Sequence, residues 1–116
     1  MNYKLLIDGV CVNWQIALQE NEWYFTDFRE KLITNISDSD IEQCINYLSK
    51  IIVREENEYL LSEYLETLYV LCKKYNSTKI PIELEKSMSF LNKISEKSEY
   101  LKTLVKEIKI MFLIVE

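Results

Sequence analysis

NEYLLSEYLETLYVLCKKY, residues 57–75, has the clearest periodicity in the chain. Its apolar side chains recur every three or four positions, which is the period of one face of an α-helix. The members of this stripe are Leu61, Tyr64, Leu65, Leu68, Cys72 and Tyr75. A stripe this wide predicts a helix that contacts neighbours on more than one side.

The segment before it starts at residues 37–40, SDSD. Ser39 and Glu42 have the spacing of a capping box, in which the serine hydroxyl and the glutamate carboxylate each accept from a free amide at a helix start. The apolar stripe that follows consists of Ile41, Cys44, Ile45, Leu48 and Ile52. These residues predict another amphipathic helix.

Two more helices are predicted after residues 76–79, which interrupt the pattern. Pro81 suits the first turn of a helix because its missing N–H costs nothing there. The stripe of that helix is Leu84, Met88, Leu91 and Ile94. After a break at residues 95–98, a long last helix is indicated by Leu101, Leu104, Val105, Ile108, Met111, Phe112 and Val115. Its end, residues 110–115, is apolar enough to be a strand instead.

The first 36 residues have a weaker pattern, in which Gly9 interrupts the earliest apolar stretch. Asn21 stands as a cap before an apolar repeat formed by Trp23, Phe28 and Leu32. Two helices are expected here, which brings the total to about six.

We therefore predict an all-α fold with a single domain, residues 1–116. The chain has one glycine and one proline, whereas β-rich folds need many residues that tolerate tight turns. Short breaks between amphipathic helices favour antiparallel neighbours. A compact bundle and a short α-solenoid-like stack of helical hairpins both fit, and the width of the stripes favours the stack.

The side-chain inventory argues against several kinds of catalytic and metal site. With no histidine, the chain lacks the commonest general base and metal ligand. Cys11, Cys44 and Cys72 are far apart in apolar segments, so they are expected to be buried free thiols and not zinc ligands. One glycine cannot form a phosphate-binding loop. We expect no cofactor, no metal and no enzymatic activity.

Carboxylate pairs are the remaining candidates for chemistry, because acids three residues apart share a helix face. The pairs are Asp27 with Glu30, Glu63 with Glu66, and Glu96 with Glu99. Pairs of this kind hold Mg²⁺ in all-α nucleotide pyrophosphohydrolases, but those sites also need acids on a facing helix. Solvated helix faces are the simpler interpretation of such pairs.

Charge is distributed unevenly along the chain. Residues 1–66 contain 13 acids and 5 bases, net −8, while residues 67–116 contain 6 acids and 9 bases, net +3. An acidic surface repels nucleic acid and anionic membranes and attracts basic proteins. In the basic half, the lysine stripe of Lys102, Lys106 and Lys109 is expected to be a solubilising face.

The location expected for such a chain is the cytoplasm. The longest apolar run, residues 110–115, is too short to span a membrane, and residues 1–9 have no export signal. An odd number of cysteines in apolar segments also suits a reducing compartment. We expect a soluble protein with a basic protein partner and no contact with nucleic acid or membranes.

The helix over residues 57–75 also predicts a binding surface, opposite its apolar stripe. On that side lie Tyr59, Glu63, Glu66, Tyr69 and Val70. Tyrosine brings a large contact area with little rotamer entropy, and carboxylates pair with basic side chains. Two acidic loops are further candidates, with the carboxylates of Asp38, Asp40, Glu55, Glu56 and Glu58. The other interpretation places this helix at the centre of the fold, with its tyrosines packed under neighbouring helices.

Residues 13–18, NWQIAL, and the hairpin region that closes in residues 78–84, TKIPIEL, complete a small acidic helical protein. In this general character the chain resembles the helical immunity proteins of bacterial polymorphic-toxin and contact-dependent growth inhibition systems. The resemblance implies an antidote that binds one cognate toxin domain, often a basic nuclease, and blocks its active site or substrate surface. It assigns no role to any individual residue.

Three hypotheses of function follow. The first is an immunity protein or antitoxin whose acidic face binds a basic toxin domain. The second is a helical adaptor or structural module, such as a subunit that forms a homodimer through its tyrosines, or a phage-encoded inhibitor. The third is a magnesium-dependent nucleotide hydrolase that uses helix-borne carboxylates.

Overall fold

The computed structural model describes residues 1–114, and all of its regular structure is helical. The elements are α1 (Tyr3–Val10), α2 (Trp14–Glu20), α3 (Tyr24–Asn35), the 3₁₀ turn η1 (Asp38–Asp40), α4 (Ile41–Ile52), α5 (Glu58–Tyr75), α6 (Ile82–Ser95) and α7 (Glu99–Met111). The all-α prediction is confirmed, with one helix more than the six expected.

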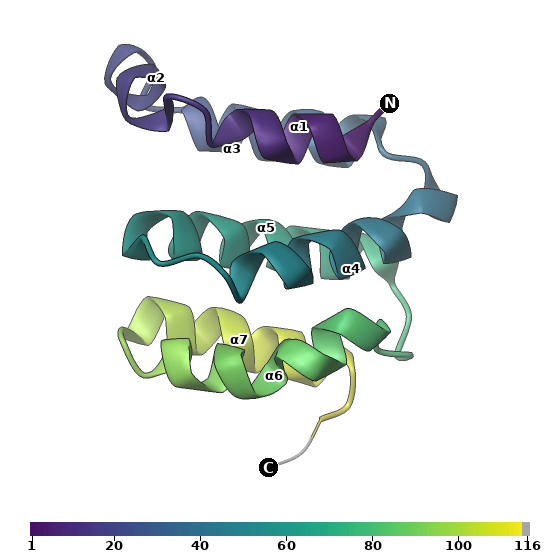
Figure 1. Ribbon diagram of the computed structural model, residues 1–116. Coiled ribbons are helices and arrows are strands. Elements are labelled where there is room, and N and C mark those ends of the chain that lie inside the picture. Colours follow the sequence, from purple (N-terminus) through teal and green to yellow (C-terminus); the bar gives the residue numbers. More distant parts are fainter. Residues whose placement is uncertain (115–116) are drawn as a thin grey trace.

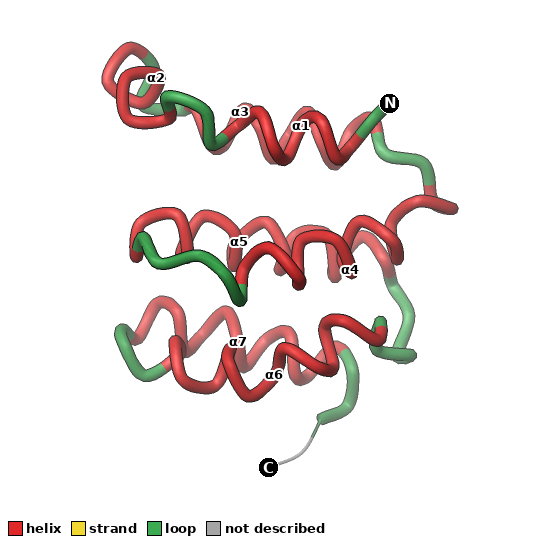
Figure 2. The backbone as a smooth tube through the Cα atoms, in the orientation of Figure 1, coloured by secondary structure: helices red, strands yellow, loops and turns green. Residues whose placement is uncertain are grey.

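The helices form three tiers (Figure 1). The first tier holds α1 beside α3 with α2 at one end, the second pairs α4 with α5, and the third pairs α6 with α7. Between tiers, α1 packs on α4 and α4 on α6, while α3 packs on α5 and α5 on α7. The connections alternate between the two ends of the tiers (Figure 2). This is the stack of helical hairpins that the wide stripes favoured.

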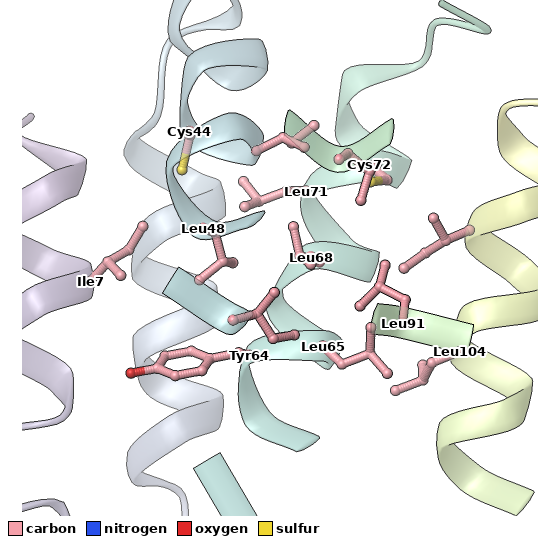
Figure 3. Packing of buried hydrophobic residues seen from close by; sticks show 14 of the residues in the cluster. Ile7, Cys44, Leu48, Tyr64, Leu65, Leu68, Leu71, Cys72, Leu91 and Leu104 are labelled. Atoms are coloured by element: carbon pink, nitrogen blue, oxygen red, sulfur yellow. The ribbon is translucent and has the colours of Figure 1, made fainter. Parts of the chain in front are cut away.

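Helix α5 lies at the centre of the stack and contacts α3, α4 and α7. Figure 3 shows Leu68 and Leu65 of α5 facing Leu48 of α4 on one side and Leu91 of α6 on the other. The predicted stripe is buried except for the half-buried Tyr75, and burial extends beyond it to Leu60, Thr67 and Leu71. Thr67 satisfies its hydroxyl by donating to the Glu63 carbonyl at 2.7 Å. The stripe is wide because three helices cover it.

Asparagine side chains and backbone conformations fix both ends of α5. At its start, the Asn57 side-chain oxygen accepts from the Leu60 amide at 3.0 Å. At its end, Asn76 has φ of 51°, the left-handed conformation that asparagine tolerates after a helix. The predicted range of 57–75 is therefore correct to within one residue.

The other predicted stripes also face the core. All five stripe residues of α4 are buried, as are Leu84, Leu91 and Ile94 of α6, while Met88 is half-buried. Pro81 stands one residue earlier than predicted, at the cap position directly before α6, and its carbonyl accepts from the Glu85 amide at 3.0 Å. The strand alternative at the C-terminus is wrong for the described residues, because Ile110 and Met111 are helical, 112–113 form a turn and 114 has no regular structure. Val115 lies outside the described residues.

The predicted capping box at Ser39 and Glu42 is wrong. A 3₁₀ turn precedes α4, so Ser39 lies inside that turn and its hydroxyl is 3.2 Å from the hydroxyl of Ser37. No side-chain hydrogen bond caps the start of α4. The Asp40 amide instead donates to the Ser37 carbonyl at 3.0 Å, which closes the turn that leads into α4.

The N-terminal region contains three helices and not the two expected. Asn13 adopts the left-handed conformation, with φ of 54°, and this interrupts the helical backbone between the short helices α1 and α2. Asn21 is not the cap of the next helix, because α3 starts at Tyr24 with Trp23 in the cap position and no side-chain cap. The Asn21 side-chain oxygen accepts from the Trp23 amide at 3.0 Å in the turn before α3. Trp23 itself is 60% exposed, whereas the apolar repeat predicts it to be buried.

The three cysteines are free thiols in unequal surroundings. Cys44 and Cys72 are buried, and burial raises the pKa of each thiol to about 12 from the ordinary 9.0. Cys11 is only half-buried, against expectation, and its sulfur contacts the Tyr64 hydroxyl across the first and second tiers. Separately, within residues 1–114 every helix is too short or too polar to cross a membrane.

Replacing Leu68 by alanine should lower the free energy of unfolding by about 2–5 kcal/mol, because the side chain is fully buried and its loss leaves a cavity. The control is Ile82→Ala on α6, where 57% of the residue is exposed and the expected change is below about 0.5 kcal/mol. Urea titrations followed by circular dichroism measure both. Equal losses would show that α5 is not central.

Stability should also fall as the pH rises from 9 to about 12, because thiols of ordinary pKa 9.0 ionise in the unfolded chain while Cys44 and Cys72 stay neutral when folded. Because the folded-state pKa is raised, the contribution of these thiols to the free energy of unfolding is complete below pH 9 and decreases as the pH rises above 9. The melting temperature of the double variant Cys44→Ala, Cys72→Ala should fall less steeply between pH 9 and pH 10. An unchanged slope would contradict this.

Candidate functional site

The outward side of α5, together with side chains from α3 and α7, forms a polar and aromatic surface that crosses all three tiers. We call it the α5 face and define it by Trp14, Arg29, Ile33, Tyr59, Glu63, Glu66, Val70 and Tyr100. Four of these residues belong to the surface predicted on α5, and the other four come from α2, α3 and α7. The helical spacing of the α5 members places them on one side of that helix.

Arg29 of α3 binds both predicted carboxylates of α5. Its Nη1 donates to Glu63 Oε1 at 2.6 Å, and its Nη2 lies 2.9 Å from Glu66 Oε2. The side chains of Arg29 and Glu63 are only 12% and 15% exposed. A charged group this close to burial is stable only when it is paired, so this bridge joins the first tier to the second.

The bridge changes the roles predicted for the two carboxylates. Glu63 has its charge paired with Arg29 and little exposed surface, so it supports the face from beneath. The Glu66 side chain is 33% exposed and retains a surface that a ligand can contact. Two carboxylates and one guanidinium leave the trio with a net charge of −1.

A tyrosine stands at each end of the bridge. Tyr59 lies on the side of Glu63, and Tyr100 of α7 lies on the side of Glu66. Partial burial and the neighbouring carboxylate raise the pKa of each phenol above 10.0. The residues are 43% and 51% exposed, so both tyrosine rings are available at the surface.

Trp14 of α2 stacks on Tyr59. The two ring centroids are 5.2 Å apart with an angle of 4° between the planes, and Phe25 packs against both rings. Offset stacking of this kind stabilises an aromatic pair beyond the area it buries. The short helix α2 therefore positions the aromatic end of the α5 face.

A cavity of about 410 Å³ lies where α3 meets α5. Ile33 and Val70 supply its apolar walls, and Arg29 and Glu30 are among its polar lining. Val70 was predicted as a binding residue, and the structure places it in a cavity large enough for an aliphatic side chain. The cavity adjoins the bridge because both are lined by Arg29.

The remaining predicted residues lie elsewhere. Tyr69 is half-buried against the core, with Lys73 Nζ 5.3 Å from the centre of its ring. Asp38 and Asp40 lie before α4, whereas Glu55 and Glu56 follow it, so the two acidic loops stand at opposite ends of that helix (Figure 1). Glu58 pairs with Lys97 of the third tier at 2.8 Å. The structure therefore does not gather the predicted acids into one patch.

The prediction made from the helix over residues 57–75 missed Trp14, Arg29 and Tyr100. Each comes from a different helix and reaches the α5 face only through the stacking of the tiers. Arg29 did carry one usable signal, since it stands between Phe28 and Leu32 in an apolar repeat. A base at the edge of a buried stripe usually has an acidic partner.

The carboxylate pairs considered for magnesium have a different environment from a metal site. Arg29 occupies the position between Glu63 and Glu66 that a cation would need. In residues 1–114, no three acidic or cysteine side chains come together closely enough to hold a metal ion.

Comparison of the chain with protein-family models, with curated proteins and with solved structures finds no match. The function is therefore inferred from the side chains of the α5 face and from the distribution of charge.

Removing the Arg29 side chain should destabilise the protein by roughly 2–4 kcal/mol, because Glu63 would remain mostly buried without its partner. Lys106→Ala on α7 is the control, since Lys106 is exposed, and should change stability by less than about 0.5 kcal/mol. Thermal unfolding of Arg29→Ala and Lys106→Ala measures the difference. A similar small effect for both variants would show that the bridge contributes no stability.

Proposed function

We propose that this chain is a cytoplasmic immunity protein or antitoxin, which binds a basic toxin domain through the α5 face and catalyses no reaction. The observation that supports this most is the pair of half-exposed tyrosines, Tyr59 and Tyr100, beside the carboxylates at the two ends of the Glu63–Arg29–Glu66 bridge. Rigid, partly exposed aromatic residues are typical energetic centres of protein interfaces.

Preorganisation favours tight binding by this surface. The Tyr59 ring packs between Trp14 and Phe25, so it loses little freedom when a partner covers it. The cavity between Ile33 and Val70 would receive an apolar side chain of the toxin. Aromatic anchors beside a small apolar cavity give a surface that recognises shape as well as charge.

Charge supports a basic partner. The acidic half of the chain, residues 1–66 with a net charge of −8, lies within the first two tiers and their connections. Glu30 borders the α5 face and Glu66 is its more exposed carboxylate, so basic side chains of a toxin could pair there. The wider acidic surface would raise the rate of encounter with a basic nuclease domain.

Inhibition would follow from occlusion. A nuclease must expose a basic surface to bind the phosphates of its substrate. An acidic protein that covers this surface competes directly with nucleic acid. Binding to an acidic partner, or to nucleic acid itself, would not fit the charge of the first two tiers.

The direct test uses a toxin domain encoded by a neighbouring gene. Co-expression of this chain should restore growth of cells that produce the toxin, and the purified proteins should form a stable complex at equal numbers of chains. Growth arrest that persists despite normal levels of this chain would contradict the proposal. So would the lack of any toxin gene beside it, which would favour an adaptor.

In that complex, Tyr59→Ala should raise the dissociation rate and weaken binding by about 2 kcal/mol, roughly thirty-fold. Ile82→Ala, on a side chain of α6 outside the α5 face, should leave the rates unchanged. Stopped-flow and surface-bound kinetics separate the two rates. Equal rates for all three proteins would place the interface away from the α5 face.

Charge reversal should affect the association rate instead. Glu30→Lys with Glu56→Lys changes two exposed acids of the first two tiers and should slow association at low salt, an effect that salt screens over roughly 8–10 Å. The control is Glu85→Lys, an exposed acid of α6 in the third tier. If Glu85→Lys slows association as much, steering would not come from the acidic half.

A further inference from the structure

The first tier leaves an apolar groove open on its outer side. The groove has a volume of about 310 Å³, and six of its nine lining residues are Leu5, Leu6, Gly9, Val10, Tyr24 and Phe28. All nine come from α1, α3 and the turn before α3, so the groove opens away from the second tier. Leu5 is 69% exposed, and the nearby Trp23 at the start of α3 is 60% exposed.

The opposite end of the stack is different. The groove between α6 and α7 is lined mainly by polar and charged residues, among them Lys102, Lys106, Lys109 and Glu96. In stacked helical proteins the end tiers carry a polar outer face, which keeps them soluble. Six of the nine lining residues of the third-tier groove are polar or charged, whereas the first-tier groove has three polar or charged residues. The first-tier groove is therefore the more apolar of the two by its lining residues, and the exposed Leu5 stands at it.

Gly9 adds an independent observation. It is the only glycine of the chain and lies within α1, where its backbone does not need a positive φ. A Cβ placed on Gly9 would meet no atom within 4 Å, so the isolated chain has room for alanine, which forms helices better. The missing side chain instead opens the floor of the groove to close approach by another helix.

We infer that a second copy of this chain covers the groove, with first tier against first tier across a twofold axis. The charges of the groove fit this occupant. Asp27 and Lys31 both line it and stand one turn apart on α3, and Asn21 holds the Asp27 carboxylate at 3.0 Å. A twofold axis between these positions brings Asp27 of each copy opposite Lys31 of the other. One acid and one base on the same rim make this surface complementary to a copy of itself across a twofold axis.

This arrangement also reuses the packing inside the chain. Each tier already lies against another pair of helices, and the dimer would place α1 and α3 of one copy against the same helices of the other. Arg29, Ile33 and Glu30 of α3 do not line the groove, so the α5 face of each copy stays open. The dimer would therefore leave the proposed toxin site uncovered and would present two α5 faces.

The test is the mass of the purified full-length chain in solution, by light scattering and sedimentation at micromolar concentrations. The wild type should have twice the 13.9 kDa mass of one chain. Leu5→Glu should dissociate it, with affinity reduced at least about ten-fold, because two carboxylates would enter the apolar groove. Ile110→Glu, at a 55% exposed side chain in the opposite groove, should remain dimeric. Circular dichroism confirms that each variant is folded.

Charge exchange tests the twofold arrangement separately. Asp27→Lys alone places lysine against lysine, and Lys31→Asp alone places aspartate against aspartate, so each should be monomeric. An equal mixture of these two variants should form a heterodimer, because each pair is then of opposite charge. A monomeric wild type, a Leu5→Glu protein that stays dimeric, loss of the dimer in Ile110→Glu, or a mixture that stays monomeric would each overturn the inference.

Discussion

The burial of α5 on three sides is the constraint on which the structure depends. Leu65, Leu68 and Leu71 have no exposed surface, so this helix cannot lie at the edge of the molecule. One neighbouring pair of helices cannot cover so wide a stripe, and tiers on both sides are required. The alternating connections, the central position of the second tier and the contacts of α5 with α3 and α7 all follow from this burial.

The same constraint determines what the α5 face is made of. Once three sides of α5 are covered, only a narrow outward strip remains, and its edges lie against α3 and α7. Carboxylates on such a strip lose part of their hydration, and Glu63 therefore needs a cation from a neighbouring helix. Arg29 supplies it. The predicted acidic patch is thus a paired network with aromatic ends. The interpretation of this helix as a central element is confirmed by its contacts, whereas its role as a binding surface stays a prediction.

Periodicity predicted the helices that are long and packed on neighbours. Periodicity failed in the first 36 residues because α1 and α2 have only 8 and 7 residues, too few for an apolar repeat to be recognised. In addition, the two helices are separated at Asn13, which is neither a glycine nor a proline. The capping-box spacing misled because serine and aspartate serve a 3₁₀ turn as well as a helix. For the α5 face, the members on α5 itself were predictable from one helix, whereas Trp14, Arg29 and Tyr100 depend on the order of the tiers.

Helix α3 links the two surfaces because it contributes to both. Its buried stripe, with Phe25 and Leu32, divides its exposed side chains into two sets. Arg29 and Ile33 turn toward α5, while Asp27 and Lys31 turn toward the groove beside α1. A helix of 12 residues has room for three such stripes because successive side chains are rotated by about 100° around the helix axis. Contacts in the groove therefore involve α3, the same helix that positions Arg29. A dimer would hold α3, and with it the bridge, in place for a partner.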